Sequence, residues 1–236
     1  MKTIFITGGS TGIGRATVKK FVAEGWNVAF MDVNKPMAES LLAEIGNSEQ
    51  LLFVAGDTRS RDDLQKAVAA AVQKFGEVNS VFANAGIHQN NTLLDISEED
   101  LRKIVDINVF GTVYTLKAVL PEIIRTGGGS VVINCSDQWL VGKPSTFAYG
   151  MTKGALGQIT RSLSIDLAKD NVRVNAICPG SIQTPLLEGA MERFAVINNI
   201  TVEQMISQEN SIYARGRMGQ PVEVANLVFF LESDQG

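Results

Sequence analysis

Short apolar runs rich in β-branched residues alternate along the chain with segments in which apolar residues recur every three or four positions. The runs are typical of buried strands, and the segments between them are typical of helices. The predicted strands cover residues 3–7, 27–32, 51–57, 78–86, 130–136 and 172–180, and the predicted helices cover 15–24, 37–46, 61–76, 98–125, 147–169 and 221–232.

Strands separated by helices of this length need right-handed crossover connections, and such connections produce parallel sheets. The pattern predicts an α/β fold: a single-domain, Rossmann-like, doubly wound parallel sheet with helices on both faces. We find no repeat or linker in the sequence, so we expect residues 1–236 to form one domain. Residues 183–214 form an amphipathic insertion. A mobile lid over a ligand and a helical pair used only for packing are both open interpretations of it.

The composition is that of an ordinary globular protein, and it argues against several classes of function. The 236 residues are 45% hydrophobic and 19% charged, and the formal net charge is −4. An acidic chain without a basic block does not favour nucleic acid or a membrane surface as a partner, and we expect no membrane span. The chain has one histidine and two cysteines, so we expect no metal site and a cytoplasmic location.

A glycine-rich turn, T-G-G-S-T-G-I-G at residues 7–14, separates the first predicted strand from the first helix. Glycines permit a tight turn there and let backbone N–H groups approach a phosphate, and the helix N-terminus adds favourable partial charge. A glycine-rich string alone is a weak signal, but its position between a strand and a helix strengthens it. The turn predicts a binding site for the pyrophosphate of a dinucleotide.

Asp32 ends the second predicted strand, downstream of this turn. A carboxylate at this place accepts hydrogen bonds from the ribose hydroxyls of NAD and repels the 2′-phosphate of NADP. The alternative is a turn-forming aspartate in M-D-V-N. Arg15 and Lys35 are the nearby basic residues that a 2′-phosphate would need. We therefore predict NAD as the cofactor in preference to NADP.

Polar or small residues also follow the other predicted strands. Asp57 follows the third strand, Asn84-Ala85-Gly86 the fourth, Ser136 the fifth and Pro179-Gly180 the sixth. Ligands of parallel sheets gather at the carboxyl ends of the strands. Turns and helix caps put polar residues at such places too, but their coincidence at so many strand ends favours one ligand site along this edge.

The segment Y-G-M-T-K at residues 149–153 places a tyrosine one helical turn before a lysine. The two side chains share a face of the helix. A phenol has a pKa of about 10, too high for a base at neutral pH, and a nearby ammonium lowers that pKa. Packing for Tyr149 and a solvated charge for Lys153 are the structural alternatives. The spacing favours a pair that moves protons.

Together these motifs resemble the short-chain dehydrogenase/reductase family. The resemblance rests on T-G-x-x-x-G-x-G at 7–14, N-A-G at 84–86, Asn108, Ser136, Y-x-x-x-K at 149–153 and P-G at 179–180, which follow the family's order over nearly the whole chain. The family implies hydride transfer between C4 of a nicotinamide and a carbinol or carbonyl carbon. It also implies a homodimer or a homotetramer.

The resemblance implies a role for each catalytic position. Tyr149 is the expected general acid/base, and Lys153 is expected to favour its phenolate, aided by the positive charge of the oxidised nicotinamide, and to hold the nicotinamide ribose. Ser136 is expected to orient the substrate oxygen. Asn108 is expected to hold a water that links Lys153 to solvent. Singly, each residue also has a structural interpretation, such as a strand-end cap for Ser136 and a buried helix polar group for Asn108.

The remaining expected contacts form two sets. The cofactor is expected to touch Gly8, Ser10, Thr11, Gly12, Ile13, Asp32, Val33, Asp57, Thr58, Asn84, Ala85, Gly86, Tyr149, Lys153, Pro179, Gly180, Ile182 and Thr184. The substrate is expected to touch Ser136, Tyr149, His88, Gln138 and Trp139. The polar side chains of this region, including Asp137, favour a polyol, a sugar or a hydroxy acid over a fatty substrate.

We therefore predict an NAD-dependent oxidoreductase that acts on the CH–OH group of a secondary alcohol or on its ketone. Two alternatives stay open. Asp32 argues against an NADPH-dependent 3-oxoacyl-thioester reductase, and the complete catalytic set argues against a non-catalytic dinucleotide-binding regulatory protein. The sequence ends at L-E-S-D-Q-G, whereas family members usually continue into a short last strand. Either the chain is truncated, or the sequence stops short of the native end; if the segment is missing, we expect the sheet to lack an edge strand.

Overall fold

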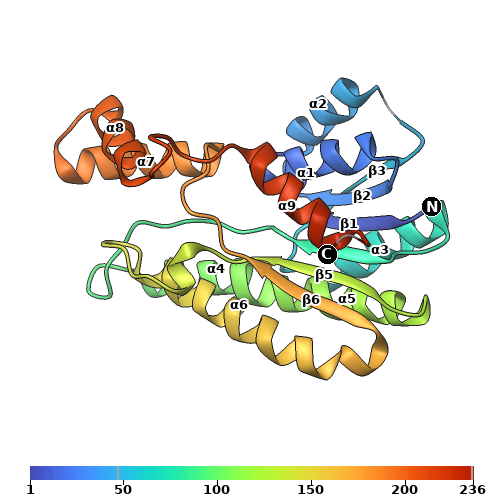
Figure 1. Cartoon of the computed structure of the whole chain (residues 1–236). Helices are drawn as coiled ribbons and strands as arrows, with labels where there is room; N and C mark the ends of the chain where they lie inside the picture. Colours follow the sequence, from blue (N-terminus) through green and yellow to red (C-terminus); the bar gives the residue numbers. More distant parts are fainter. Residues whose placement is uncertain (47, 235) are drawn as a thin grey trace.

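The computed structural model describes residues 1–46, 48–234 and 236. Within these residues, six parallel strands form one sheet in the order β3-β2-β1-β4-β5-β6 (Figure 1). The strands are β1 (Thr3–Thr7), β2 (Asn27–Asp32), β3 (Leu51–Ala55), β4 (Ser80–Ala83), β5 (Gly129–Asn134) and β6 (Val172–Ile177). The strand order reverses between β1 and β4, and the carboxyl ends of these two strands border the crevice in which such sheets bind ligands.

Helices cover both faces of the sheet, which confirms the predicted doubly wound fold (Figure 1). One face carries α1 (Gly12–Ala23), α2 (Lys35–Ile45) and α9 (Pro221–Glu232), and the other carries α3 (Arg61–Phe75), α4 (Glu98–Val105), α5 (Gly111–Arg125) and α6 (Phe147–Asp166). The 183–214 insertion holds α7 (Pro185–Asn198) and α8 (Val202–Ile212), which stand away from the sheet beyond the carboxyl ends of its strands.

The strands are buried on both sides, because successive side chains of a strand point to opposite faces. Ile4 and Ile6 belong to the hydrophobic cluster beneath α1 and α9, whereas Phe5 belongs to the cluster beneath α3, α5 and α6. All three side chains are fully buried. The two clusters hold the sheet rigid and so hold its strand ends in place.

The predicted helix over 98–125 is interrupted by one wider turn. α4 begins after Ser97, whose Oγ accepts a hydrogen bond from Asp100 N. A π-helical segment, Asp106–Phe110, then joins α4 to α5. Such turns are frequent at functional sites, and this one contains Asn108. The wider turn is a feature that hydrophobic periodicity does not reveal.

The continuous helix from Glu98 to Arg125 is long and apolar enough to cross a membrane by length and composition, contrary to the expectation of no such run. Here it packs against β4 and β5 and beside α3 and α6. A core helix of a soluble protein passes the same test, so the finding is weak evidence for a membrane span.

The fourth strand is shorter than predicted, because β4 ends at Ala83 rather than at Gly86. Asn84 N and Ala85 N donate to Thr7 Oγ1, at 3.1 and 3.2 Å, instead of to a neighbouring strand. The chain therefore leaves the sheet one residue after Ala83 and passes alongside the glycine turn.

Candidate active site

The glycine turn lies between β1 and α1, as the sequence predicts. Gly8 and Gly12 have φ angles of +66° and +52°, which L side chains rarely adopt. A Cβ on Gly14 would lie 2.0 Å from the Gly8 carbonyl oxygen. The Thr11 side chain does not cap α1, so the first N–H groups of the helix face the groove without a side-chain acceptor. The turn therefore has the features that a pyrophosphate site requires.

Asn84 fastens this turn to the end of β4. Its Nδ2 donates to the carbonyls of Thr7 and Gly8, both at 3.0 Å, and its Oδ1 accepts from Asn134 Nδ2 at 2.9 Å. Asn84 also lines the groove. Its side chain thus serves to hold the turn in shape.

Asp32 forms part of the groove wall at the end of β2. Its Oδ2 accepts from Ser10 N at 3.0 Å and its Oδ1 from Asn34 N at 2.9 Å. Arg15 is turned to other partners, because its guanidinium donates to the Ser10 carbonyl and pairs with Glu44 on α2. The carboxylate is therefore held in place, and the Arg15 guanidinium is already engaged.

The groove has a volume of about 450 Å³. It brings together most of the predicted cofactor contacts, namely Gly8, Thr11, Gly12, Ile13, Asp32, Val33, Asp57, Thr58, Asn84, Ala85, Gly86 and Thr184. Ser10 is fully buried and takes part through its backbone N–H to Asp32. The other predicted contacts, Tyr149, Lys153, Pro179, Gly180 and Ile182, line an adjoining cavity.

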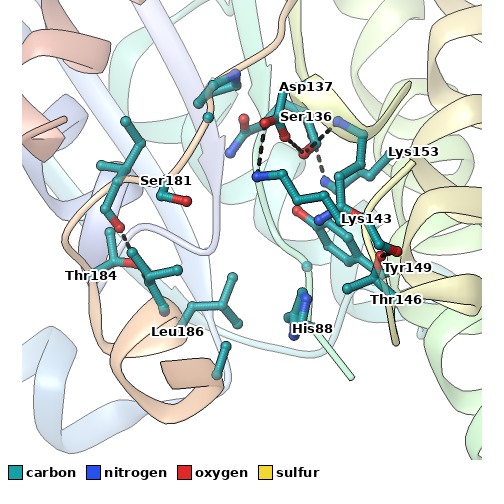
Figure 2. Close-up of a pocket in the computed structure, with 18 of the residues that line it drawn as sticks. His88, Ser136, Asp137, Lys143, Thr146, Tyr149, Lys153, Ser181, Thr184 and Leu186 are labelled. Atoms are coloured by element: carbon teal, nitrogen blue, oxygen red, sulfur yellow. Dashed lines mark hydrogen bonds and ion pairs between the residues drawn. The ribbon is translucent and has the colours of Figure 1, made fainter. Parts of the chain in front are cut away.

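The adjoining cavity has a volume of about 150 Å³ and shares Ile13, Gly86 and Thr184 with the groove. Ser136, just after β5, and Tyr149 and Lys153, both on α6, line it together (Figure 2). A ligand that extends along the groove would therefore end beside these three side chains.

Ser136 is buried and hydrogen-bonded on two sides. Its Oγ donates to Asp137 Oδ1 at 2.9 Å and accepts from Gln138 N at 3.2 Å. Burial raises the pKa of Tyr149 to about 12, although a hydrogen bond with Ser136 opposes the rise. The phenol is therefore protonated at neutral pH in this arrangement.

Lys153 is buried against the sheet. Its Nζ donates to the Asn134 carbonyl at 2.7 Å and lies 5.5 Å from the centre of the Tyr149 ring. Burial lowers the pKa of Lys153 to about 8. Lys153 alone therefore does not bring the pKa of Tyr149 below its ordinary value, and the expected acidification requires a further positive charge in the cavity.

Asn108 is fully buried, and its side chain joins two elements of the site. Its Oδ1 accepts from Ile87 N at 2.8 Å, and its Nδ2 donates to the Ile87 carbonyl at 3.0 Å and to Thr152 Oγ1 at 3.1 Å. The side chain therefore clamps the loop after β4 to α6. Its expected role in holding a water stays a prediction.

His88 and Gln138 both line the cavity. The His88 ring lies 4.7 Å from the Tyr149 ring between centres. Burial and the nearby cations Arg193 and Lys143 lower the pKa of His88 to about 4, so the imidazole is neutral. Within the described residues, His88 Nδ1 and Gln138 Oε1 are buried without a hydrogen-bond partner. Such atoms favour a polar ligand in the cavity.

Trp139 is a corrected prediction, because it does not line the cavity. Its ring packs on α6, where a Cβ on Gly157 would lie 2.1 Å from it, and Arg161 stacks over its other side at 4.7 Å. The reason is local geometry. Asp137–Trp139 is a 3₁₀ turn, in which successive side chains point about 120° apart.

Two charged residues of the cavity were not predicted. Lys143, in the loop between Ser136 and Tyr149, and Glu209, on α8, both line it. The position of Lys143 between two catalytic candidates was a usable signal. Glu209 is one of several acidic residues in the insertion, and the sequence does not distinguish it. Apolar residues of α7 complete the wall, namely Leu186, Leu187, Ala190, Met191 and Phe194.

Comparison with known proteins agrees with this geometry. The family model described as short chain dehydrogenase matches residues 2–193. A 2,5-dichloro-2,5-cyclohexadiene-1,4-diol dehydrogenase from Sphingobium indicum is 37% identical over 235 residues, which cover 99% of this chain and 90% of the relative. An L-fucose dehydrogenase from Mus musculus is 34% identical over 234 residues, or 99% and 82% of the two chains.

Solved structures show the same likeness. The crystal structure of a 3-ketoacyl-(acyl-carrier-protein) reductase from Brucella melitensis, complexed with NADH, has a TM-score of 0.88 and 30% identity. The match covers 99% of this chain and 91% of that one. The chain therefore belongs to the short-chain dehydrogenase family. It is an oxidoreductase of the class that acts on CH–OH groups, and it binds a nicotinamide dinucleotide.

Proposed function

We propose that this protein is an NAD(H)-dependent dehydrogenase that transfers a hydride between the nicotinamide and a secondary alcohol or its ketone, with a polyol, a sugar or a hydroxy acid as the substrate class. The observation that carries the proposal is the convergence of Ser136, Tyr149 and Lys153 on one cavity at the end of the dinucleotide groove. A non-catalytic dinucleotide-binding protein has no need for that arrangement.

The preference for NAD over NADP is supported by the charges around Asp32. Two backbone N–H groups hold the Asp32 carboxylate at the groove wall, where it suits ribose hydroxyls and repels a phosphate. Arg15 is paired with Glu44 on α2, and Arg59, which lines the groove, is paired with Asp57. A 2′-phosphate would meet the Asp32 carboxylate and would have to compete for a guanidinium that is already paired.

The side chains divide the chemistry among them. When bound, NAD would supply the hydride acceptor and, in its oxidised form, a positive charge that favours the Tyr149 phenolate. Tyr149 takes the hydroxyl proton of the alcohol, since the phenolate is the base and the phenol the acid of the reverse reaction. Ser136 orients the substrate oxygen. Lys153 holds the nicotinamide ribose and adds positive charge near the phenolate, and Asn108 keeps the loop after β4 against α6.

Small hydroxylated substrates are supported by the cavity and by the relatives. The unpartnered His88 Nδ1 and Gln138 Oε1 suit a substrate with hydroxyl donors, and two relatives are named for a diol and for L-fucose. The rival activity is an NADPH-dependent reduction of a 3-oxoacyl thioester. The 3-ketoacyl reductase among the similar structures favours the thioester substrate, but that structure is complexed with NADH. Asp32 argues against the NADPH part of that alternative.

The proposal extends to the setting in which the protein works. We propose that α7 and α8 close over the ligand, since Met191 and Phe194 already line the cavity.

We also propose a cytoplasmic enzyme, because Cys135 and Cys178 are free thiols and such thiols persist in a reducing compartment. A homodimer or homotetramer is proposed from apolar side chains exposed on α6, such as Phe147 and Met151. Light scattering on the purified protein tests the last point.

A fluorescence titration with NADH and, in parallel, NADPH tests the cofactor proposal. We expect NADH to bind at least about tenfold more tightly, which corresponds to about 1.4 kcal/mol. Asp32→Ala should narrow the difference between the NADH and NADPH affinities. Asp62→Ala, at an exposed position on α3, should leave that difference unchanged. Tighter binding of NADPH to the wild type would favour the thioester reductase instead. NADH binding without NAD-dependent oxidation of any secondary alcohol in a broad panel would favour the regulatory protein.

A further inference from the structure

Asp137 and Lys143 form an ion pair inside the substrate cavity, and neither residue belongs to the motifs that identify the family. Lys143 Nζ lies 2.9 Å from Asp137 Oδ2, and the side chains are 33% and 29% exposed. Both line the cavity, in the loop between Ser136 and Tyr149 (Figure 2). The pair therefore lies beside the residues expected to touch the reacting oxygen.

The ion pair keeps hydrogen-bonding capacity for a ligand. Asp137 Oδ1 accepts a hydrogen bond from the Ser136 hydroxyl, and Oδ2 is paired with Lys143 Nζ. Each carboxylate oxygen has room for a further donor. Within the described residues, Asp137 is the acceptor that Lys143 Nζ reaches, and an ammonium has three N–H donors. A hydroxyl group both donates and accepts, so it can bond with both members of the pair at once.

The charges around the pair favour a neutral group over a carboxylate. Burial opposes the charge of Lys143, but Asp137 and the nearby Glu209 outweigh it and raise the pKa of Lys143. Glu209 is itself buried and bonds Ser181 Oγ. A substrate anion that approached Lys143 would therefore meet two carboxylates. Of the other cations near the cavity, Lys153 donates to a backbone carbonyl and Arg193 donates to Asn90.

The position of the pair indicates which hydroxyl it would bind. Ser136 is expected to contact the reacting oxygen, and Asp137 is hydrogen-bonded to Ser136. A group bound to Asp137 and Lys143 therefore lies beside the Ser136 hydroxyl that is expected to contact the reacting oxygen. This position favours a substituent close to the reacting carbon, and the adjacent carbon is the nearest place for it. The cavity, at about 150 Å³, matches in size one that accepts benzene. The expected nicotinamide contacts line the same cavity, so the substrate is no larger than about a six-membered ring.

We propose that Asp137 and Lys143 form a specificity subsite for the hydroxyl group on the carbon next to the reacting carbinol. The substrate is then a small, neutral vicinal diol, such as a cyclic polyol or a sugar. This inference rests on the proposed dehydrogenase function and narrows it, because it excludes hydroxy acids.

Matched alcohols test the subsite in the full chain with NAD. The ratio of kcat/KM for cyclohexane-1,2-diol, in its cis and trans forms, to that for cyclohexanol measures the value of the second hydroxyl, as does the ratio for butane-2,3-diol to butan-2-ol. We expect a ratio of at least about tenfold in one pair, since the second hydroxyl gains hydrogen bonds to two charged groups. 3-Hydroxybutyrate, which carries a carboxylate on the same carbon chain, should be a poor substrate.

Two variants separate recognition from a structural role. Lys143→Met should bring the diol-to-alcohol ratio close to one. Asp137→Asn leaves the Lys143 charge unpaired, so it should raise kcat/KM for 3-hydroxybutyrate relative to the diol, a change that a folding defect does not produce. Lys117→Met, at an exposed position on α5, is the matched control and should leave every ratio unchanged.

The outcomes distinguish a failure of the proposed subsite from a failure of the proposed dehydrogenase function. Turnover of simple alcohols and diols with equal kcat/KM, or a diol preference that survives Lys143→Met, overturns the subsite and leaves the dehydrogenase function standing. Preference of the wild type for 3-hydroxybutyrate assigns the site to an anion and overturns the inference as well. Binding of NADH with no turnover of any of these alcohols overturns the subsite together with the proposed function.

Discussion

The cofactor groove and the substrate cavity share a wall, but they are built in different ways. The groove is made at the ends of β1, β2, β3 and β4, and its shape depends on backbone turns and on short side chains such as Asp32. The cavity is made by the loop between Ser136 and Tyr149, by the segment after β6 and by α7 and α8. A rigid sheet edge therefore holds the cofactor, and longer side chains on connecting segments face the substrate.

This difference indicates where function is constrained and where it varies. Backbone groups at strand ends suit a ligand part that is always the same, such as a pyrophosphate. Side chains on loops and on an insertion can change without disturbing the sheet. The residues of the groove therefore indicate the class of cofactor, and the residues of the cavity indicate the individual substrate.

The largest expected effect lies where the two regions meet, at Tyr149. Tyr149→Phe removes the proton-transferring hydroxyl and keeps the ring, so turnover should fall by about 10³-fold while NADH binding stays close to that of the wild type. Steady-state kinetics and fluorescence titration of the same preparation measure both. A variant that keeps near-wild-type turnover would show that another group handles the proton.

The groove should tolerate far less change in its backbone than the cavity side. Gly14→Ala places a Cβ 2.0 Å from the Gly8 carbonyl oxygen, so it must displace the turn, and NADH binding should weaken by at least about tenfold. Gly154→Ala on α6 meets no atom within 4 Å and serves as the control. Equal NADH affinity of the two variants would show that the glycine turn is not part of the cofactor site.

The pH dependence of alcohol oxidation should reveal the pair Tyr149 and Lys153. Oxidation needs the phenolate, and burial raises the pKa of Tyr149 to about 12, so kcat/KM should rise about tenfold per pH unit from pH 6 upward. The pKa of Lys153 is about 8. Above pH 8 the predominant form is the Tyr149 phenol with a neutral Lys153. The reactive form, phenolate with ammonium, carries the same number of protons, so its fraction no longer changes with pH and the rise of kcat/KM should level off.

A pH–rate profile of kcat/KM with saturating NAD measures this behaviour. Lys153→Met should remove the break near pH 8 and lower the rate at every pH. A profile that is flat between pH 6 and pH 8 in the wild type would mean that Tyr149 is already ionised once NAD is bound, so that the positive charge of the nicotinamide outweighs the effect of burial.

The smallest effect concerns Trp139, which the sequence suggested for the cavity and the structure places on α6. Gly157→Ala would press a Cβ into the Trp139 ring and should lower the free energy of unfolding by about 1–3 kcal/mol. Gly154→Ala, in open space on the same helix, should raise it by about 0.5–1 kcal/mol. Urea denaturation measures both. Equal stability of the two variants would place Trp139 elsewhere.

Much of the fold and part of the site follow from local patterns in the sequence. Short, fully buried apolar runs in strands such as β1 and amphipathic periodicity in helices such as α3 make the element order readable. A glycine turn between a strand and a helix indicates the groove. The wider turn around Asn108 and the early end of β4 do not follow from these patterns. Both depend on side-chain bonds to distant residues, such as Asn108 to Ile87.

The sequence by itself determined the doubly wound sheet, the glycine turn, the acid after β2 and the tyrosine one turn before the lysine. Each of these is a local pattern whose physical meaning is set within one turn or one strand. Only the tertiary structure decided which side chains face one another across the cavity. It directed Trp139 into packing, engaged Arg15 with Glu44, paired Lys143 with Asp137 and brought Glu209 from the insertion to the same cavity. Most of these contacts join residues far apart in the chain, and the geometry of each depends on how the elements pack.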